Sequence, residues 1–270
     1  ETAGSDMADL SVIKARVLRN MQCFQSARSI LEASLKRIPV NEDARLMLGD
    51  TLRSLNEFDA AFDVLSDGGD ASHAVARLKL MIEYGDVHAT LAFGQMASAR
   101  WPNDMTLQVL CAQTFVRDLQ ADKAVQLLDS ALGRDPASHA VRHARIDLAL
   151  RQNDLDAART MLVTTTDGLA SLQLWQRLDG LSGSASDATD ARIVQRVKAI
   201  HDAAPSTGLT HRAHLELGDL FFLKGDWKQA LEHFRSSGAN TGRNRARAMK
   251  MARCHYRLLN FEACRRALER

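Results

Sequence analysis

The sequence predicts an all-α protein, a right-handed superhelical solenoid of about 14 to 16 antiparallel helices arranged in pairs. The first observation is that the chain of 270 residues holds only four prolines, which are evenly spaced. Their intervals are close to two, one and two periods of about 34 residues. Because proline inside a helix removes a hydrogen bond and clashes with the preceding turn, the spacing indicates helical units of that length. The prolines are Pro39, Pro102, Pro136 and Pro205.

A ladder of small residues has the same period and predicts where the helices approach each other. Each small residue is followed four positions later by a large apolar residue, which suits a close helix contact beside a filled groove. The long step from Ala158 to Ala230 implies one divergent unit, and the short step before Ala89 follows the helix break expected at Asp67-Gly68-Gly69-Asp70. The pairs are Ala27–Leu31, Ala61–Leu65, Ala89–Phe93, Ala124–Leu128, Ala158–Leu162, Ala230–Phe234 and Cys264–Leu268.

Three stretches share a more specific pattern with a known repeat. The best is His214-x-x-Leu217-Gly218-x-x-Phe221, followed by Gly225, Trp227, Ala230 and Phe234. The second is Arg45-x-x-Leu48-Gly49-x-x-Leu52 with Phe58, Ala61 and Leu65, and the third is Cys111-Ala112-x-x-Phe115 with Ala124, Leu128 and Pro136. With these motifs the chain resembles the tetratricopeptide repeat family, a helix-turn-helix unit of about 34 residues. The family usually has Trp where His214 stands.

The resemblance covers nearly the whole chain and implies its organisation. Residues 8–167 are expected to form repeats one to five, and residues 168–205 a divergent helical repeat with a Gly/Ser-rich turn at 180–186. Residues 206–270 are expected to form repeats seven and eight and to continue in a longer protein. Residues 1–7 are expected to be a cloning remnant or a disordered start, because the first residues are polar and do not begin with Met.

Composition fits this architecture and narrows the cellular setting. The chain is 46% hydrophobic, 25% charged and only 5% aromatic, so alanine and leucine provide most of the packing. No apolar run approaches the roughly 20 residues that span a membrane, and no signal peptide is visible. The four cysteines form no C-x-x-C pair and are read as small buried or isolated thiols, which favours a reducing, cytoplasmic location.

Catalytic and metal-binding patterns are weak. His139 and His143 are four positions apart, a spacing that can hold a metal, but no Glu follows His139 and no third ligand is evident. Surface or groove histidines are the preferred interpretation. No G-x-S-x-G, P-loop or dinucleotide fingerprint occurs. The sequence therefore predicts a non-catalytic segment with no cofactor and no metal.

The resemblance also implies a binding surface, because the first helix of each repeat lines a concave groove in this family. Its inward positions, carried over to this chain, include Arg16, Asp50, Arg53, Arg117, His143, Asp147, Arg151, Asp219, Arg245, Arg253 and Arg257, and also Arg19, Asn20, Gln113, Arg212 and Tyr256. His143, Asp147 and Arg151 share one helix face, and an ion pair between Asp147 and Arg151 is the alternative to a binding role. The Lys/Asn set that grips chaperone C-termini is replaced here by Leu46, Met47, Ala74 and Val75.

Charge is concentrated near the end of the sequence. Residues 241–270 hold nine basic and two acidic residues, a net charge of +7, while the whole chain is +2 and the first 240 residues are therefore −5. This segment predicts an acidic neighbour, either a downstream domain or a partner protein, with Arg245, Arg253 and Arg257 as its contacts. A solvated face is the alternative. Nucleic acid is disfavoured because only Tyr256 and Phe261 could stack on bases.

The function expected from these observations is a protein-protein interaction scaffold that binds an extended peptide or a docked domain in its groove. The alternative is the N-terminal scaffold of a larger bacterial enzyme, because relatives can precede glycosyltransferase- or sulfotransferase-like domains. Self-association is a further alternative, because the last helices leave Leu258, Leu259 and Leu268 uncovered.

Overall fold

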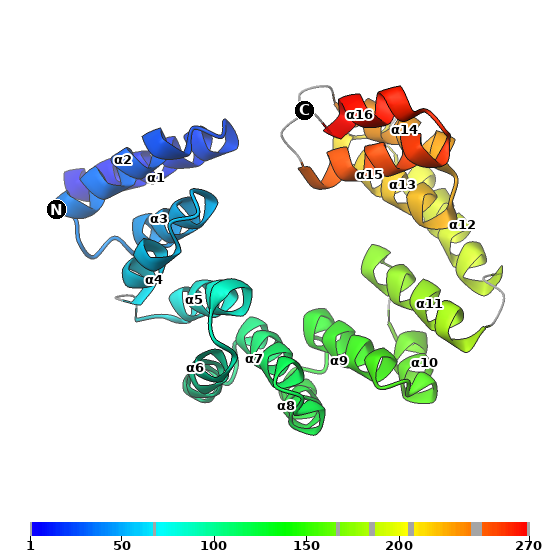
Figure 1. The fold of residues 1–270 in the computed structure, drawn as a ribbon, viewed down its shortest axis with the longest axis horizontal. Coiled ribbons are helices and arrows are strands. Elements are labelled where there is room, and N and C mark those ends of the chain that lie inside the picture. The colour runs from blue at the N-terminus through cyan, green and yellow to red at the C-terminus, as the bar shows by residue number, and fades with distance from the viewer. Residues whose placement is uncertain are drawn as a thin grey trace. The chain divides into compact units, whose positions relative to one another are not determined.

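Helices are the only regular elements in the part of the chain that the structure describes. The computed structural model describes residues 2–66, 69–165, 168–183, 187–204, 208–238 and 245–268, with side chains for all of these except residues 2–9, 187 and 245. Within these ranges there are 16 helices (Figure 1). They are α1 (Thr2–Asn20), α2 (Phe24–Arg37), α3 (Glu42–Ser54), α4 (Phe58–Ser66), α5 (Ala71–Tyr84), α6 (Val87–Arg100), α7 (Met105–Arg117), α8 (Ala121–Arg134), α9 (His139–Arg151), α10 (Leu155–Val163), α11 (Leu169–Ser182), α12 (Asp187–Asp202), α13 (His211–Lys224), α14 (Trp227–Ser236), α15 (Arg245–Arg257) and α16 (Phe261–Leu268).

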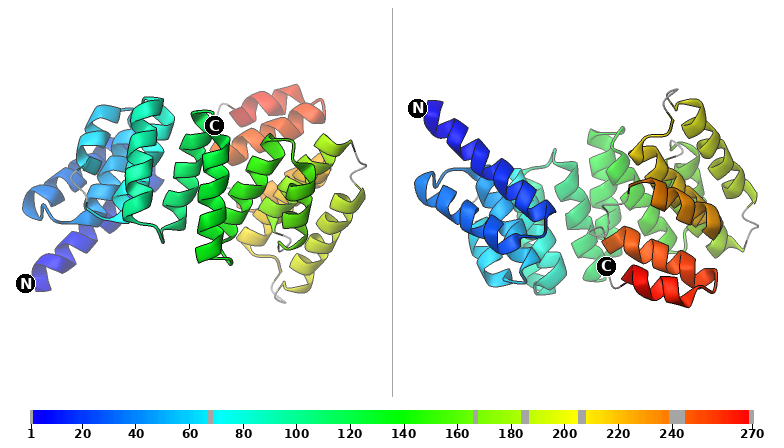
Figure 2. Two further views of the ribbon diagram at one scale, coloured as in Figure 1. Left: turned by 90° about the horizontal axis from the view of Figure 1, so that it is seen from below. Right: turned by 90° about the horizontal axis from the view of Figure 1, so that it is seen from above.

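The chain divides into two compact units, residues 1–145 and 146–270, and each is built from consecutive helix pairs. In the first unit α1 packs on α2, α3 on α4, α5 on α6, and α7 on α8. In the second unit α11 packs on α12, α13 on α14, and α15 on α16. Within the first unit α1 is the longest helix, with 19 residues, and it extends beyond α2 at its N-terminal end (Figure 2). The predicted all-α architecture of paired helices, about eight pairs in all, is confirmed.

One turn geometry joins the two helices of most pairs. In six pairs a single residue with φ between 58° and 81° follows the first helix. The next amide then donates to the carbonyl oxygen five positions earlier, at 2.8–2.9 Å, which is the Schellman ending of a helix. The left-handed residues are Gln22, Asn56, Leu119, Asn153, Gly225 and Leu259. Successive members of this set are 34 residues apart in three steps and 63 and 72 residues, about two repeats, apart in the other two, so the turn has the same period as the proline spacing.

The turn also begins the second helix, because the residue after the left-handed position is often its N-cap. The side chains of Asp154, Asp226 and Asn260 each accept a hydrogen bond from the amide three positions later, at 3.1–3.2 Å. Such caps satisfy amides that have no partner inside the helix. A very short connection therefore ends one helix and starts the next, which fixes the two as antiparallel neighbours.

Most of the small–large ladder lies in the core as predicted. Its buried members are Ala27, Leu31, Ala61, Leu65, Ala124, Leu128, Ala158, Leu162, Ala230 and Phe234. The last pair of the ladder, in α16, is less covered, since Cys264 is half-buried and Leu268 is exposed.

Two members of the ladder differ from the sequence expectation. Ala89 is exposed, and the buried position in α6 is taken by Thr90, whose hydroxyl donates to the Asp86 carbonyl at 2.5 Å. The divergent unit hidden in the long step of the ladder has Thr189 and Ile193 at the two positions, both buried in α12. Threonine was missed because it is polar, yet its hydroxyl finds a partner within the core.

The connection after α4 lies where the sequence predicts a helix break, whereas the connection after α11 starts later than predicted. Helix α4 has only nine residues and ends at Ser66, which accounts for the short step before Ala89. Helix α11 continues through Gly180 to Ser182, and Gly183 with φ +65° ends it. The expected Gly/Ser-rich turn therefore starts later than Gly180, and its residues 184–186, like Pro205, lie outside the described residues.

Glycine permits the closest approach inside two of the pairs. A Cβ atom added to Gly218 in α13 would lie 2.6 Å from the ring of Phe234 in α14. A Cβ atom added to Gly49 in α3 would lie 2.7 Å from Leu65 in α4. Glycine inside a helix costs about 1 kcal/mol relative to alanine. The large side chain that occupies the vacated space compensates for this cost.

Histidines pack between the helices of the α13–α14 pair. His214, at the family's usual Trp position, has its Nδ1 3.0 Å from Nδ1 of His233, and the His233 ring stacks on Phe221 with centroids 5.3 Å apart. Burial lowers the pKa of His233, with smaller contributions from the charges of His214 and His201 against that of Glu232. His214, where the family usually has Trp, is therefore packed between the two helices.

Replacing Gly218 with Leu should destabilise the protein by about 1–3 kcal/mol, because the new side chain would collide with Phe234. Gly133→Leu is the matched control, because open space surrounds Gly133 near the end of α8. The control should be neutral or slightly stabilising. Urea denaturation followed by circular dichroism measures both free energies of unfolding. Equal effects of the two substitutions would contradict the proposed close contact.

Stability should fall as the pH is lowered from about 7 toward about 5.5. Because the pKa of folded His233 is below the usual value of about 6.5, the unfolded chain binds the proton first. The stabilising contribution is complete above about pH 6.5 and is lost as pH falls toward the depressed pKa. His233→Asn should reduce this pH dependence in urea titrations, whereas His88→Asn, at an exposed site, should preserve it. An unchanged pH dependence in His233→Asn would contradict the assignment.

Candidate functional site

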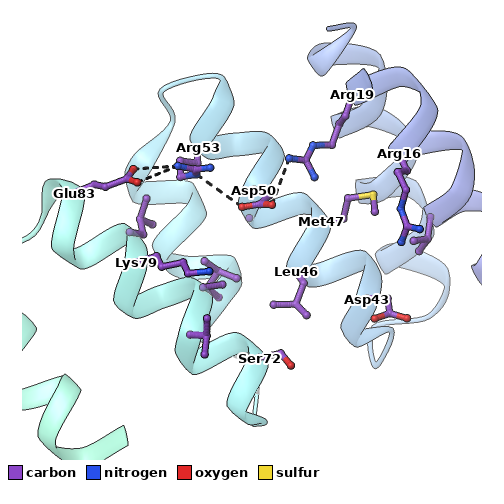
Figure 3. A pocket seen from close by; sticks show the side chains of 16 residues that line it. Arg16, Arg19, Asp43, Leu46, Met47, Asp50, Arg53, Ser72, Lys79 and Glu83 are labelled. Atoms are coloured by element: carbon purple, nitrogen blue, oxygen red, sulfur yellow. Dashed lines mark hydrogen bonds and ion pairs between the residues drawn. The ribbon is translucent and has the colours of Figure 1, made fainter. Parts of the chain in front are cut away.

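The first helices of three neighbouring pairs, α1, α3 and α5, enclose a pocket of about 580 Å³ in the first unit (Figure 3). We call it the α1–α3–α5 pocket. Its apolar lining includes Leu46 and Met47 from α3 and Val75 and Ala76 from α5. Its charged lining consists of Arg16, Arg19, Asp43, Asp50, Arg53, Lys79 and Glu83.

The same helical spacing places these side chains in α3 and in α5. In α3, Leu46 and Met47 are followed by Asp50, and in α5, Val75 and Ala76 are followed by Lys79 at the same interval. Side chains three, four and seven positions apart lie on one face of a helix. The two helices therefore present equivalent faces to the pocket. Each face has two adjacent apolar side chains, which we call the apolar step, and a charged side chain about one turn farther along the helix.

Ion pairs join the three helices along the wall of the pocket. The guanidinium of Arg19 lies 3.4 Å from the carboxylate of Asp50, which also lies 3.8 Å from Nε of Arg53. Nη1 of Arg53 lies 3.1 Å from Glu83 (Figure 3). Exposed pairs of this kind contribute about 0–1 kcal/mol each, so they fix side-chain positions more than they stabilise the fold.

Two cations of the pocket are not neutralised in this way. Among the residues that the structure describes, Arg16 and Lys79 form no ion pair, and Lys79 extends from α5 toward α3 (Figure 3). Within the same ranges, Asp43 is the acidic side chain of the lining without an ion pair. The pocket therefore offers two uncommitted positive charges beside an apolar step.

Similar ion pairs link first helices in the second unit. Asp147 of α9 pairs with Arg151 at 2.6 Å and also with Arg177 of α11, in the next helix pair. Asp219 of α13 pairs with Lys250 of α15 at 2.5 Å, again in the next pair. The alternative of an ion pair between Asp147 and Arg151 is thus confirmed. Arg177 and Lys250 were missed, although a charge of opposite sign nearly one repeat farther along is a signal that the sequence contains.

The remaining predicted groove residues lie apart from the α1–α3–α5 pocket. Arg117 donates a hydrogen bond to the carbonyl of Ile82 near the end of α5. The guanidinium groups of two arginines in α15 lie over aromatic rings, Arg253 at 5.6 Å from the Phe222 centroid and Arg257 at 5.9 Å from that of Trp227. The side chain of Arg245 lies outside the described residues.

His143 is half-buried, and its ring centroid lies 6.4 Å from that of His139. Burial lowers the pKa of His143, with smaller contributions from His139 and Arg142. Within the described ranges no group of three or more His, Cys, Asp or Glu side chains is arranged to hold a metal ion. None of the helices described there combines the length and apolar character needed to cross a membrane.

The structure thus brings Arg16, Asp50 and Arg53 together, as the resemblance implied, and adds Lys79 and Glu83. Lys79 and Glu83 were missed because the repeat that runs from α3 to α5 is shorter than the family's usual period of about 34 residues. A fixed step of that length from Asp50 passes beyond Lys79, so the equivalence of the two positions is not visible in the sequence.

Comparisons with known proteins agree with the helix-pair fold. Residues 14–72, which include the three helices α2, α3 and α4, match the model of the tetratricopeptide repeat family. No curated protein matches the chain.

Solved structures show the same fold over most of the chain. A tetratricopeptide repeat protein from Parabacteroides merdae is similar over 98% of both chains, with a TM-score of 0.53 and 13% identity. PilF from Pseudomonas aeruginosa is similar over 75% of this chain and 95% of its own, with a TM-score of 0.54 and 15% identity. Yeast Tom70 is similar over 92% of this chain and 54% of its own, with a TM-score of 0.63 and 12% identity.

The sequence match covers much of the part of the chain that forms the α1–α3–α5 pocket, and the structural matches extend the same helix-pair fold to the other pairs. Residues 14–72 therefore match the tetratricopeptide repeat family, and the chain has the helix-pair fold of tetratricopeptide repeat proteins.

Proposed function

We propose that this chain is a non-catalytic scaffold that binds an extended segment of a partner protein in the α1–α3–α5 pocket. The observation that carries the proposal is the combination of an apolar step with two uncommitted cations, Arg16 and Lys79, in a concave site of about 580 Å³. The segment that fits has an acidic side chain next to an apolar one.

The pocket supports this ligand by its shape and by its charge. Leu46, Met47 and Val75 offer apolar surface that an aliphatic or aromatic side chain would remove from water, at about 25 cal/mol per Å². A carboxylate placed between Arg16 and Lys79 would accept charge-assisted hydrogen bonds, which are about twice as strong as neutral ones. The existing Arg19–Asp50–Arg53–Glu83 pairs hold the surrounding wall in place before binding.

The cysteines support a cytoplasmic location for this scaffold. Cys23, Cys111, Cys254 and Cys264 are all free, and Cys111 and Cys254 are buried. Burial raises the pKa of Cys254 to about 11, so its thiol is unreactive at neutral pH. Free thiols of this kind fit a reducing compartment.

A library of short displayed peptides of random sequence, selected on the wild-type chain, tests the proposal. Selected peptides should combine an acidic and an apolar residue. In fluorescence anisotropy, Arg16→Glu and Lys79→Glu should each raise the Kd at least about tenfold, because a lost charged hydrogen bond is worth about 1.5–3 kcal/mol. Affinity should also fall as salt is added.

Lys36→Glu provides the matched control, since Lys36 is exposed on α2 and the substitution makes the same change of charge outside the pocket. It should leave the Kd within about twofold of wild type. Peptides that bind all three variants as well as wild type would place the binding surface elsewhere. Failure to select any peptide would contradict the proposed function itself.

A further inference from the structure

A second pocket, separate from the α1–α3–α5 pocket and independent of the proposed function, lies in the second unit. It has a volume of about 590 Å³ and is formed by α14, the end of α15 and the turn before α16. Small-molecule sites usually have volumes of about 300–1,000 Å³. Its lining is Lys228, Leu231, Glu232, Arg235, Ser236, His255, Leu258 and Asn260. We call it the α14–α16 pocket.

The lining side chains of α14 come from one helix face. Lys228, Leu231, Glu232 and Arg235 occupy positions i, i+3, i+4 and i+7, which coincide on a helix surface. Among the described residues, neither Lys228 nor Arg235 forms an ion pair. Both cations are exposed and reach the pocket, with Glu232 between them as the one acidic group of the lining.

His255 is the feature that points to a ligand. His255 is only 6% exposed, yet its side chain lines the pocket. No described residue forms a hydrogen bond or an ion pair with its ring. The His255 ring nitrogens are not among the buried polar atoms that lack a partner, so they are open to the pocket, where a ligand can form a hydrogen bond with them. The ring sits close enough to Arg235 for that charge to add to the effect of burial, and both lower the pKa of His255.

Two further polar groups complete the set of donors. Asn260 uses its Oδ1 atom to cap α16, by accepting from the Ala263 amide at 3.2 Å, which leaves its amide hydrogens available. The hydroxyl of Ser236 makes no hydrogen bond with the rest of the described chain. Leu231 and Leu258 add apolar surface beside these donors.

We propose that the α14–α16 pocket binds the phosphate group of a small organic phosphate ester. Lys228, Arg235, His255, Ser236 and Asn260 would donate to the phosphate oxygens, and Leu231 and Leu258 would contact the organic part. Two cations against one carboxylate leave the lining with a net positive charge. A phosphate group can contact both cations and supplies three terminal oxygens as acceptors for the donors, whereas a single carboxylate supplies two.

The experiment uses phenyl phosphate as the probe, titrated into the full chain and followed by chemical-shift changes in two-dimensional ¹H–¹⁵N NMR spectra. Saturable shifts should appear at amides of residues 228–236 and 255–260, with a Kd on the order of 1 mM. Inorganic phosphate should bind at least about fivefold more weakly, because it lacks a group for Leu231 and Leu258. Equal binding of inorganic phosphate would overturn the organic ligand.

Variants separate a built site from general attraction to a basic surface. Arg235→Ala and His255→Asn should each raise the Kd at least about fivefold. Arg257→Ala is the matched control, because it removes the same charge from the same region, while Arg257 lies against Trp227 outside the lining. It should change the Kd less than about twofold.

Because His255 is buried, its substitution could disturb folding, so the exposed Arg235 decides the result if His255→Asn loses its helical circular dichroism. Absence of saturable shifts up to about 20 mM probe, far above the expected Kd, would overturn the proposal. An equal loss of affinity in Arg235→Ala and Arg257→Ala would overturn it as well.

Discussion

The closest approach of helices in the pairs α3–α4 and α13–α14 depends on one contact, in which a glycine faces a large apolar side chain on the neighbouring helix. Gly49 against Leu65 and Gly218 against Phe234 show it most clearly, because a single Cβ atom at either glycine would come within 2.7 Å of the facing side chain. Buried alanines at corresponding positions of α2, α4, α8, α10 and α14 repeat a small side chain along the chain. Neighbouring pairs can then stack in the same orientation within a unit, which is how a repeat protein builds a continuous core from units too small to fold alone.

The proposed binding surface of the first unit follows from the repetition of the helix pairs. Because the turn inside a pair is short and ends the first helix with a left-handed residue, successive first helices present equivalent faces. In the first unit those faces carry an apolar step followed by a charge, which makes the α1–α3–α5 pocket. Four of the seven charged side chains of this pocket are paired between adjacent first helices, in Arg19–Asp50 and Arg53–Glu83, and this leaves Arg16 and Lys79 as the cations proposed to receive an acidic ligand.

Much of the fold could be predicted from the sequence, because prolines, glycines and alanines report directly on backbone constraints. The all-helical pairs, the short α4 and the burial of Ala230 follow from these residues. Thr90 and Thr189 could not be found by a search for small apolar residues, because their hydroxyls are satisfied by partners that only the fold supplies, such as Asp179 of α11, 2.6 Å from Thr189 Oγ1. The site was predicted in part, because Arg16, Asp50 and Arg53 do line one pocket. Lys79 was missed because the short repeat displaces it from the expected register. The ion-pair partners of Asp147 and Asp219 were missed because they come from the next helix pair.

A double-mutant cycle on Gly49 and Leu65 tests the central contact most directly. Gly49→Ala should destabilise the wild-type chain by about 1–2 kcal/mol, because the added methyl group collides with Leu65. In the Leu65→Ala background the collision is absent, and the same substitution should stabilise the chain by up to about 1 kcal/mol through helix propensity. The account therefore predicts a reversal of sign and a coupling energy of about 1–3 kcal/mol from urea denaturation. If Gly49→Ala has the same effect in both backgrounds, the small–large contact does not set the spacing of the helices.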